Sequence, residues 1–502
     1  MDEKARSVDE LRAEDAGKRE EAFLAARSIL GAEAEAALRE HYELFDDRLY
    51  KWMAGLYDPQ VGGFYFNECA RDTEGFLPDI ESTKQAITFF QLVGMTSGYE
   101  NLIEAYPEWM REQINGFARG LQSPEDGYFY HPQWGKDIKP SRQGRDLGWA
   151  TSTLRDFGAA PIWDAPNGVK GERGAPSAVS ESGSEAGAVA VYPERLRSVD
   201  AFRRYLICEL NGNEDPSDTT PNLIRTKSYS IGNSVGAQSG QIKQRELLGI
   251  ETGELVDSDG DGIADDGFIR TFEELFNSWI LPYNGLWEEY RSVGSDGEAV
   301  VDREGGQTYY NAINGLMKTS GAYNQLGLKF PCLREALKSA CYMAGYLGEH
   351  EDGRPGPDVM GKRPNASVDV YNPWVCITGL VANARKHCAP EEVEQMLSVV
   401  RSDAVRLIRS TTEKSRYFKK ADGSAGYRWG ECGTVSQSAP VSPAGFMGGD
   451  INGGSIATRG ITTNMCWGLG IPFVPMFGKA AWQECLAVFE AKRKGNQDSD
   501  RI

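Results

Sequence analysis

Histidine is scarce in this sequence, and its cysteines follow no metal-binding pattern. The chain has four histidines in 502 residues, and none of its nine cysteines forms a CxxC pair. A zinc site or a disulfide framework is therefore not expected, and reduced cysteines in a cytoplasmic protein are the simpler interpretation. A GxxxxGK[ST] phosphate loop, a GxGxxG fingerprint between a strand and a helix, and the HExxH pattern are also missing. These absences argue against nucleotide-dependent, hydride-transfer and zinc-protease functions, and no organic cofactor is expected.

Long apolar runs are missing as well. No stretch of 18 apolar residues occurs, so a membrane span is not expected. The N-terminus, MDEKARSVDELRAEDAGKREE, is charged and lacks the apolar centre of a signal peptide. Both features favour a cytoplasmic location.

Positive charge is in short supply. The 54 Lys and Arg residues face 73 Asp and Glu residues, which gives a formal net charge of -19. Nucleic acids and anionic membranes bind basic surfaces, so neither is an expected partner. A small anionic substrate stays open, because a few local arginines can override the overall charge. The oligomeric state is not indicated.

Helical periodicity dominates what is present. Apolar residues recur at three- and four-residue steps in about a dozen segments, and no convincing run of alternating strand residues occurs. The pattern predicts an all-α protein with helices over residues 33–56, 80–94, 99–121, 198–211, 234–249, 271–290, 308–327, 332–348, 373–387, 390–411, 460–470 and 478–493.

The loops share a signature. "YDPQVGGFYF" (57–66), "SPEDGYFYHPQWG" (123–135) and "KADGSAGYRWGE" (420–431) each place turn residues before aromatic residues, which favours short β-hairpins. Helices punctuated in this way predict a closed ring of helical hairpins, with the hairpins and long loops at its mouth. We expect a charged helical extension over 1–30 and one ring domain over 31–495, with the Gly-, Ala-, Pro- and Ser-rich segment 158–196 as an inserted loop. A domain boundary there is the alternative.

The first candidate cluster is "GGFYFNECARDTEGFLPDIESTKQAI" (62–87). Asp79 and Glu81 precede a predicted helix, where acidic side chains cap free N–H groups. The loop before them also carries Tyr65 and Arg71, and aromatic side chains beside carboxylates suit sugar rings. The alternate spacing sends the two carboxylates in different directions, so Glu81 is expected to face a pocket while Asp79 caps or braces the loop.

Two further clusters could supply the rest of a site. In residues 126–150, an arginine fork could bind a substrate carboxylate, and His or Tyr could relay protons. In residues 426–461, glycine-rich chain would allow backbone to approach a ligand. The candidates from the two clusters are Tyr128, Tyr130, His131, Trp134, Arg142, Arg145 and Asp146, and then Tyr427, Arg428, Trp429, Glu431, Asp450 and Asn452. Solvated surface hairpins are the plain alternative for both.

The segment "DSDGDGIADDG" (257–267) has the spacing of a calcium loop. Asp257, Asp259 and Asp261 alternate, Gly262 follows, and Asp265 takes the ninth position. The usual Glu at the twelfth position is replaced by Phe268. A structural Ca²⁺ is the prediction, and an acidic turn is the alternative.

The helix pairs with "GGFYF", "DGYFYHPQWG" and "DGSAGYRW" resemble the (α/α)6 toroid, or six-hairpin, glycoside hydrolases and their polysaccharide-lyase relatives. Among these the chain is similar to β-glucuronidase-like enzymes of glycoside hydrolase family 154. The resemblance covers roughly residues 35–490, is one of architecture, and implies an active site at the ring mouth among the three clusters.

Glycoside hydrolysis is therefore the leading functional prediction, with an oligosaccharide as substrate. Two carboxylates would act as general acid and as base or nucleophile, drawn from Asp79, Glu81, Asp146, Glu431 and Asp450. The arginines favour a uronic acid. The alternatives are a polysaccharide lyase that uses Tyr128, Tyr130 or His131 with Arg142 and Asn452, a sugar epimerase, and a carbohydrate-binding toroid without activity.

Overall fold

The computed structural model describes residues 6–181, 183, 185–212, 214–219, 228–287, 308–345, 366–443 and 445–499. Most of these residues are in helices and few are in strands, which agrees with the predicted all-α class. The strands are two antiparallel pairs of two residues each, β1 (Tyr57–Asp58) with β2 (Gly63–Phe64) and β3 (Val435–Ser436) with β4 (Ala439–Pro440). Among the described residues, none of the helices is long and apolar enough to cross a membrane.

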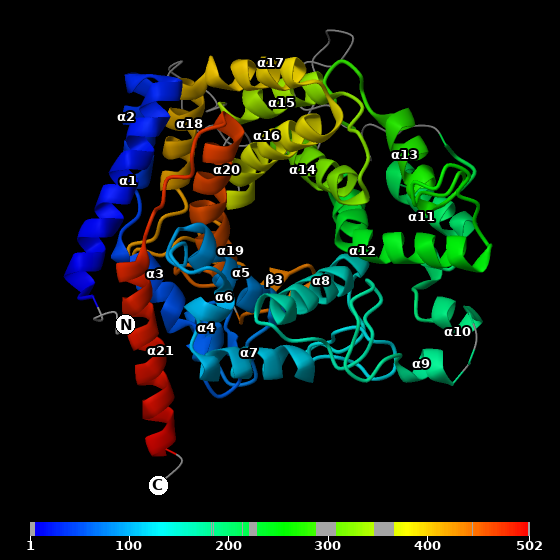
Figure 1. Cartoon of the computed structure of the whole chain (residues 1–502), viewed down its shortest axis with the longest axis horizontal. Coiled ribbons are helices and arrows are strands. Elements are labelled where there is room, and N and C mark those ends of the chain that lie inside the picture. The colour runs from blue at the N-terminus through cyan, green and yellow to red at the C-terminus, as the bar shows by residue number, and fades with distance from the viewer. Residues whose placement is uncertain are drawn as a thin grey trace.

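Six helices surround the middle of the molecule in Figure 1. They are α5 (Ile80–Leu92), α8 (Pro140–Asp156), α12 (Ser228–Thr252), α14 (Thr308–Leu326), α16 (Ser367–His387) and α20 (Ile461–Leu469). Each of these helices packs against the next one in this order, and the helical turns that lead into α20 pack against α5. These turns are α19 (Ile451–Gly454) and the π-helix η2 (Ser455–Gly460). The helices therefore pack in a closed cycle, in which the turns at residues 451–460 return to the helix that begins at residue 80.

The other helices lie outside this cycle (Figure 1). The longer ones are α1 (Val8–Leu30), α2 (Ala32–Tyr42), α3 (Asp47–Gly55), α7 (Glu108–Gly120), α11 (Val199–Asn211), α13 (Phe268–Trp279), α15 (Leu333–Ala344), α17 (Pro390–Arg401), α18 (Ala404–Arg416) and α21 (Lys479–Ser499). The short ones are α4 (Glu68–Arg71), α6 (Leu102–Ala105), α9 (Ser177–Ser180), α10 (Glu185–Ala190) and η1 (Glu194–Leu196). The last three lie in the expected insertion, 158–196.

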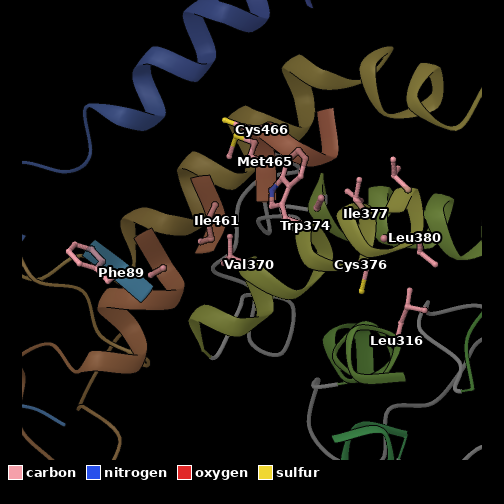
Figure 2. Packing of buried hydrophobic residues seen from close by; sticks show 14 of the residues in the cluster. Phe89, Leu316, Val370, Trp374, Cys376, Ile377, Leu380, Ile461, Met465 and Cys466 are labelled. Carbon is pink, nitrogen blue, oxygen red and sulfur yellow. The ribbon is translucent and has the colours of Figure 1, made fainter. Parts of the chain in front are cut away.

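The core runs between neighbouring helices. Figure 2 shows Trp374 and Ile377 of α16 facing Met465 of α20, with Leu316 of α14 and Phe89 of α5 in the same cluster. Apolar residues recur along α16 at steps of three and four, which gives this helix an apolar face for each neighbour. The indole nitrogen of Trp374 donates to the Thr411 hydroxyl at 2.8 Å, so its polar atom is satisfied inside the core.

Most predicted helices are found, but three are divided and the one expected over 271–290 ends early, at Trp279 of α13. It stops there because Leu281 precedes Pro282, which disfavours the helical conformation. The expected helix 33–56 divides before Asp46, which caps α3, and 99–121 divides at Pro107, which begins α7. The expected helix 390–411 divides into α17 and α18. Helix α8 was not predicted, and it contains residues 140–150 of the cluster 126–150, which was expected to be a site wall or a surface hairpin. Two of the aromatic loops form only single bridges, Gln122 with Phe129 and Lys419 with Ala425.

Candidate active site in the central cavity

A cavity of about 510 Å³ lies between five helices of the cycle and the turns that lead into α20. All five of the helices α5, α8, α12, α14 and α16 contribute to its wall, together with the loop 427–437, α19 and η2. Five aromatic side chains face it: Phe66, Trp149, Tyr229, Tyr371 and Tyr427. Their faces suit the C–H surface of a sugar ring, and the volume lies in the usual range for small-molecule sites.

Asp79 and Glu81 have different environments, as their spacing predicts. Asp79 is the N-cap of α5, where its carboxylate accepts from the backbone N–H of Ser82 at 3.0 Å. Glu81 lies in the first turn of that helix and lines the cavity. Its Oε2 accepts from Arg142 and from the Ser436 hydroxyl, each at 2.6 Å, while Oε1 lies 3.2 Å from Arg145.

Arg142 lies behind the cavity wall and joins three buried carboxylates. Its guanidinium reaches Asp79 at 3.2 Å, Glu81 at 2.6 Å and Asp146 at 2.9 Å. The indole of Trp134 covers its other side, with the guanidinium carbon 4.9 Å from the ring centroid, and His131 stacks on that indole at 4.0 Å. These residues brace α5 against α8, and all of them except Glu81 lie outside the cavity lining.

Asp146, Asp450 and Glu431 were predicted as possible second carboxylates, and none of them lines the cavity. Asp146 is buried against Arg142, and burial raises the pKa of its carboxyl to about 7. Asp450 is the N-cap of α19, where it accepts from the backbone N–H groups of Gly453 and Tyr427. Burial raises the pKa of Asp450 to about 6. Glu431 is exposed. Asp146 is therefore engaged by Arg142, Asp450 is engaged as a helix cap, and Glu431 is exposed outside the cavity lining.

The other predicted binding residues divide in the same way. Arg145, Tyr427, Arg428 and Asn452 line the cavity. The rest have local partners outside it: the hydroxyl of Tyr65 donates to Asp58, Arg71 pairs with Asp72, and Tyr130 donates to Asp126. Tyr128 is buried, and Trp429 is 42% exposed.

The hairpin of β3 and β4 lies within the predicted cluster 426–461, but its residues were not predicted to belong to the site. Ser436 donates to Glu81, and the side-chain oxygen of Gln437 accepts from Ser141 and Asn233, each at 2.9 Å. The turn residues Gln437 and Ser438 have φ values of 51° and 70°, which match a two-residue type I′ hairpin but are unusual without glycine. The hairpin is thus held over the cavity by α5, α8 and α12.

The cavity wall carries more positive than negative charge. Among the described residues that line it, Glu81 is the acid, and the cations are Lys84, Arg145, Lys318, Arg428 and Arg459. Lys84 pairs with Asp156, and Arg145 pairs with Glu81. Within the described part of the chain, Lys318, Arg428 and Arg459 have no carboxylate partner. In a protein with a net charge of -19, this concentration of cations is a local exception.

Lys318 and Arg459 were not predicted as site residues, although the sequence carries a signal for both. Lys318 is the one charged residue in the sequence of α14, and Arg459 is the one charged residue in residues 451–469. Burial lowers the pKa of Lys318 to about 7; the charge of Arg145 lowers it further, and Glu81 opposes the shift. Burial also lowers the pKa of Arg459, whose Nε donates to Ser455. A lone charge in a neutral helix was the clue to both.

A GxSxG spacing occurs at Gly232–Gly236, a pattern typical of serine hydrolases when it forms a turn between a strand and a helix. Here it lies inside α12. Ser234 is therefore part of a continuous helix and is not presented at a sharp turn. The spacing carries no support for a serine nucleophile.

The predicted calcium loop places three of its four acidic ligands together. Ligand oxygens of Asp257, Asp259 and Asp261 lie within 4.8 Å of one another. Asp265 accepts instead from the hydroxyl of Ser258 at 2.5 Å. Three carboxylates at this spacing fit a hard cation such as Ca²⁺, and calcium stays a prediction.

Comparison with known proteins gives no further guide, since no family model, curated protein or solved structure matches this chain.

Proposed function

We propose that the chain is a carbohydrate-active enzyme that binds an acidic sugar in the central cavity and cleaves its glycosidic bond. The observation that carries the proposal is a set of cations, Lys318, Arg428 and Arg459, that have no carboxylate partner among the described residues and lie in a wall rich in aromatic side chains. A uronate has both a carboxylate for such cations and a ring face for the aromatics.

The fold supports the same proposal as an (α/α)6 toroid. Six helices pack in a closed cycle. In chain order, outer and inner helices alternate, since α3, α7, α11, α13, α15 and α18 precede α5, α8, α12, α14, α16 and α20 respectively. Such alternation is what a ring of six helical hairpins requires. The short hairpins and the loop 427–437 then lie at the mouth that admits the substrate.

The cavity favours β-elimination over hydrolysis as the reaction. Hydrolysis of the usual kind needs two carboxylates on either side of the bond. The described wall offers Glu81 alone, and both oxygens of Glu81 are already engaged by Arg142, Arg145 and Ser436. Elimination needs a base, a cation beside the uronate carboxylate and a proton donor, and the wall has a candidate for each.

In this mechanism Lys318 in its neutral form removes the proton from C5 of the uronate. Arg459 stabilises the negative charge that develops on the uronate carboxylate. The electron pair forms the C4–C5 double bond, the bond from C4 to the glycosidic oxygen breaks, and Tyr427 gives that oxygen a proton. Burial raises the pKa of Tyr427, so its hydroxyl stays protonated at neutral pH. A lysine with a pKa near 7 is suited to act as a base under the same conditions.

The test is incubation with uronate-containing oligosaccharides, followed by ultraviolet absorbance and a reducing-end assay. Elimination yields an unsaturated product that absorbs in the ultraviolet, and kcat/KM rises through about pH 7 as Lys318 loses its proton. The Lys318→Met variant should lose about 10²–10⁴-fold in kcat. Lys338→Met, which changes an exposed residue of the outer helix α15, is the control.

Other results would change the conclusion in distinct ways. New reducing ends without ultraviolet absorbance would replace elimination by hydrolysis. Tight binding without any turnover would make the chain a carbohydrate-binding protein. Absence of both binding and turnover across acidic sugars would overturn the proposal.

A further inference from the structure

A second cavity adjoins the first. It has a volume of about 540 Å³ and lies between α8, α12 and α14. The two cavities share Arg145, Trp149, Met317, Lys318 and Tyr371, so they meet at the proposed base. Beyond the shared residues, the wall of the second cavity has no charged side chain among the described residues. Away from the shared residues, the first cavity therefore carries further charged side chains, whereas the described wall of the second cavity is neutral.

Glycines provide much of the space in the second cavity. Gly148 of α8, Gly236 of α12 and Gly321 of α14 all line it. A methyl group added at Gly148 or Gly321 would meet nothing within 4 Å, and one added at Gly236 would meet only a backbone oxygen at 3.6 Å. Alanine would therefore fit at all three positions, where each helical glycine costs about 1 kcal/mol relative to it.

Helix packing explains another glycine but not these three. At Gly144 of α8, an added methyl group would lie 2.6 Å from the backbone oxygen of Ala237, so close contact between α8 and α12 requires glycine there. Nothing comparable constrains Gly148, Gly236 or Gly321. These three glycines instead leave open volume beside Lys318.

Two buried polar atoms of residues in this wall lack hydrogen-bond partners in the described part of the chain. Gln241 is 1% exposed; its side-chain oxygen accepts from the Tyr128 hydroxyl, and its Nε2 has no partner among the described residues. Asn167 donates from Nδ2 to Thr151 at 3.0 Å, and no described residue pairs with its buried Oδ1. An unmade buried hydrogen bond costs about 1–3 kcal/mol. These two atoms are enclosed in the wall. The lining also has amide and hydroxyl side chains from Asn233, Ser239 and Gln325, which match sugar hydroxyls, because each hydroxyl donates and accepts.

We propose that the second cavity is a subsite for an uncharged sugar. The substrate is then an oligosaccharide in which a neutral residue is linked to the uronate, and the bond to be cleaved spans the junction at Lys318 and Arg145. This inference rests on the proposed function, because the uronate is assigned to the first cavity.

The experiment compares two substrates and one inhibitor. An oligosaccharide of alternating glucuronate and N-acetylglucosamine should be a better substrate than an oligomer of uronate alone, by at least about tenfold in kcat/KM. This corresponds to about 1.4 kcal/mol. Glucuronate itself should inhibit competitively from the first cavity. Equal kcat/KM for the two oligomers would overturn the neutral subsite.

Substitutions of the open glycines give an independent test. Gly148→Leu should raise KM for the alternating oligosaccharide at least about tenfold, with the inhibition constant of glucuronate unchanged, and Gly321→Ala should act more weakly. Gly116→Leu is the matched control, since Gly116 is an exposed glycine of α7 with nothing within 4 Å of an added methyl group. Melting temperatures at or above that of the wild type would show that the variants fold, because each replaces a helical glycine.

The two proposals fail in different ways. If Gly148→Leu leaves KM for the alternating oligosaccharide unchanged while glucuronate still inhibits, the second subsite is wrong and the first cavity keeps its assignment. If neither glucuronate nor the oligosaccharides bind the wild type, the assignment of the first cavity fails, and the subsite fails with it.

Discussion

Arg142 is a single residue on which much of the wall depends. It is fully buried, as are its partners Asp79, Glu81 and Asp146. The Arg142→Met variant leaves three buried carboxylates without their cation, so the free energy of unfolding should fall by about 3–5 kcal/mol. Urea denaturation measures the change.

A control for this prediction lies in the same helix. Arg155 of α8 is 77% exposed in its side chain and pairs with Asp156 at 3.3 Å. Arg155→Met should change stability by less than about 0.5 kcal/mol, because exposed ion pairs contribute little. Equal losses in both variants would contradict the role given to Arg142.

Asp146 should make stability depend on pH. Burial raises its pKa from 3.8 to about 7, so between these values the folded protein binds more protons than the unfolded chain. Stability from this group is present at low pH and is lost as the pH rises through about 7. The melting temperature of the wild type should therefore fall relative to that of Asp146→Asn between pH 5 and 8. A constant difference, equal to that for the exposed Asp200→Asn, would contradict this.

The role of a single residue can be predicted from the sequence only where local geometry decides it. Asp79 caps α5 and Glu81 lines the cavity, as their alternate spacing predicts, but both carboxylates also contact the guanidinium of Arg142, which the spacing does not show. Asp450 and Glu431 lie in a glycine-rich segment whose path is set by distant contacts. No local pattern shows that the carboxylate of Asp450 is engaged as the N-cap of α19.

Among the elements, α8 shows why one helix of the site was missed. Its sequence, PSRQGRDLGWATSTLRD, has two glycines, several charges and few apolar residues. Gly144 weakens the helix in isolation but allows α12 to approach closely, so tertiary packing supplies what local propensity lacks. The longer amphipathic helices could be predicted because their apolar faces are visible in the sequence.

The β3–β4 hairpin offers a test of strain at the element scale. Ser438 has a φ of 70°, a conformation that costs a residue with a side chain about 1 kcal/mol or more. Ser438→Gly should raise the melting temperature, and Ser438→Val should lower it, in differential scanning calorimetry. The same direction of change in both variants would show that the turn is not strained.

The acidic loop 257–267 is a second testable element. If Ca²⁺ binds through Asp257, Asp259 and Asp261, a hundredfold excess over the dissociation constant should stabilise the fold by about 2.7 kcal/mol. Thermal unfolding with and without chelator measures this, and Asp259→Asn should abolish the difference. Asp266→Asn, outside the triad, should keep it. An unchanged melting temperature for the wild type would identify the loop as an acidic turn.

Over the whole molecule, the central contacts join parts of the chain that no local analysis can connect. The hydrogen bond from Ser436 to Glu81 spans 355 residues, and η2 packs on α5 across a similar interval. Glu431 and Asp450 of the cluster 426–461 were candidates for the second carboxylate beside Glu81. That cluster does reach Glu81, but through Ser436, because the closed packing cycle decides which side chains face inward.

The contrast between an acidic molecule and a cationic cavity has a kinetic consequence. An approaching polyanion first meets the field of a chain with a net charge of -19, and only at short range the attraction of Lys318, Arg428 and Arg459. Salt shortens the long-range field from about 30 Å at 0.01 M to about 8 Å at 0.15 M. The association rate of an acidic oligosaccharide, measured by stopped flow, should therefore rise with added salt over this interval, while dissociation also accelerates.

A rate that falls steadily with salt would mean that the cavity's own field extends beyond the surface. If the rate instead rises with salt, the acidic exterior limits which substrates reach the cavity. Long, densely charged chains are held off, and short acidic fragments that can enter the cavity are admitted, so the protein would act late in the breakdown of a polysaccharide.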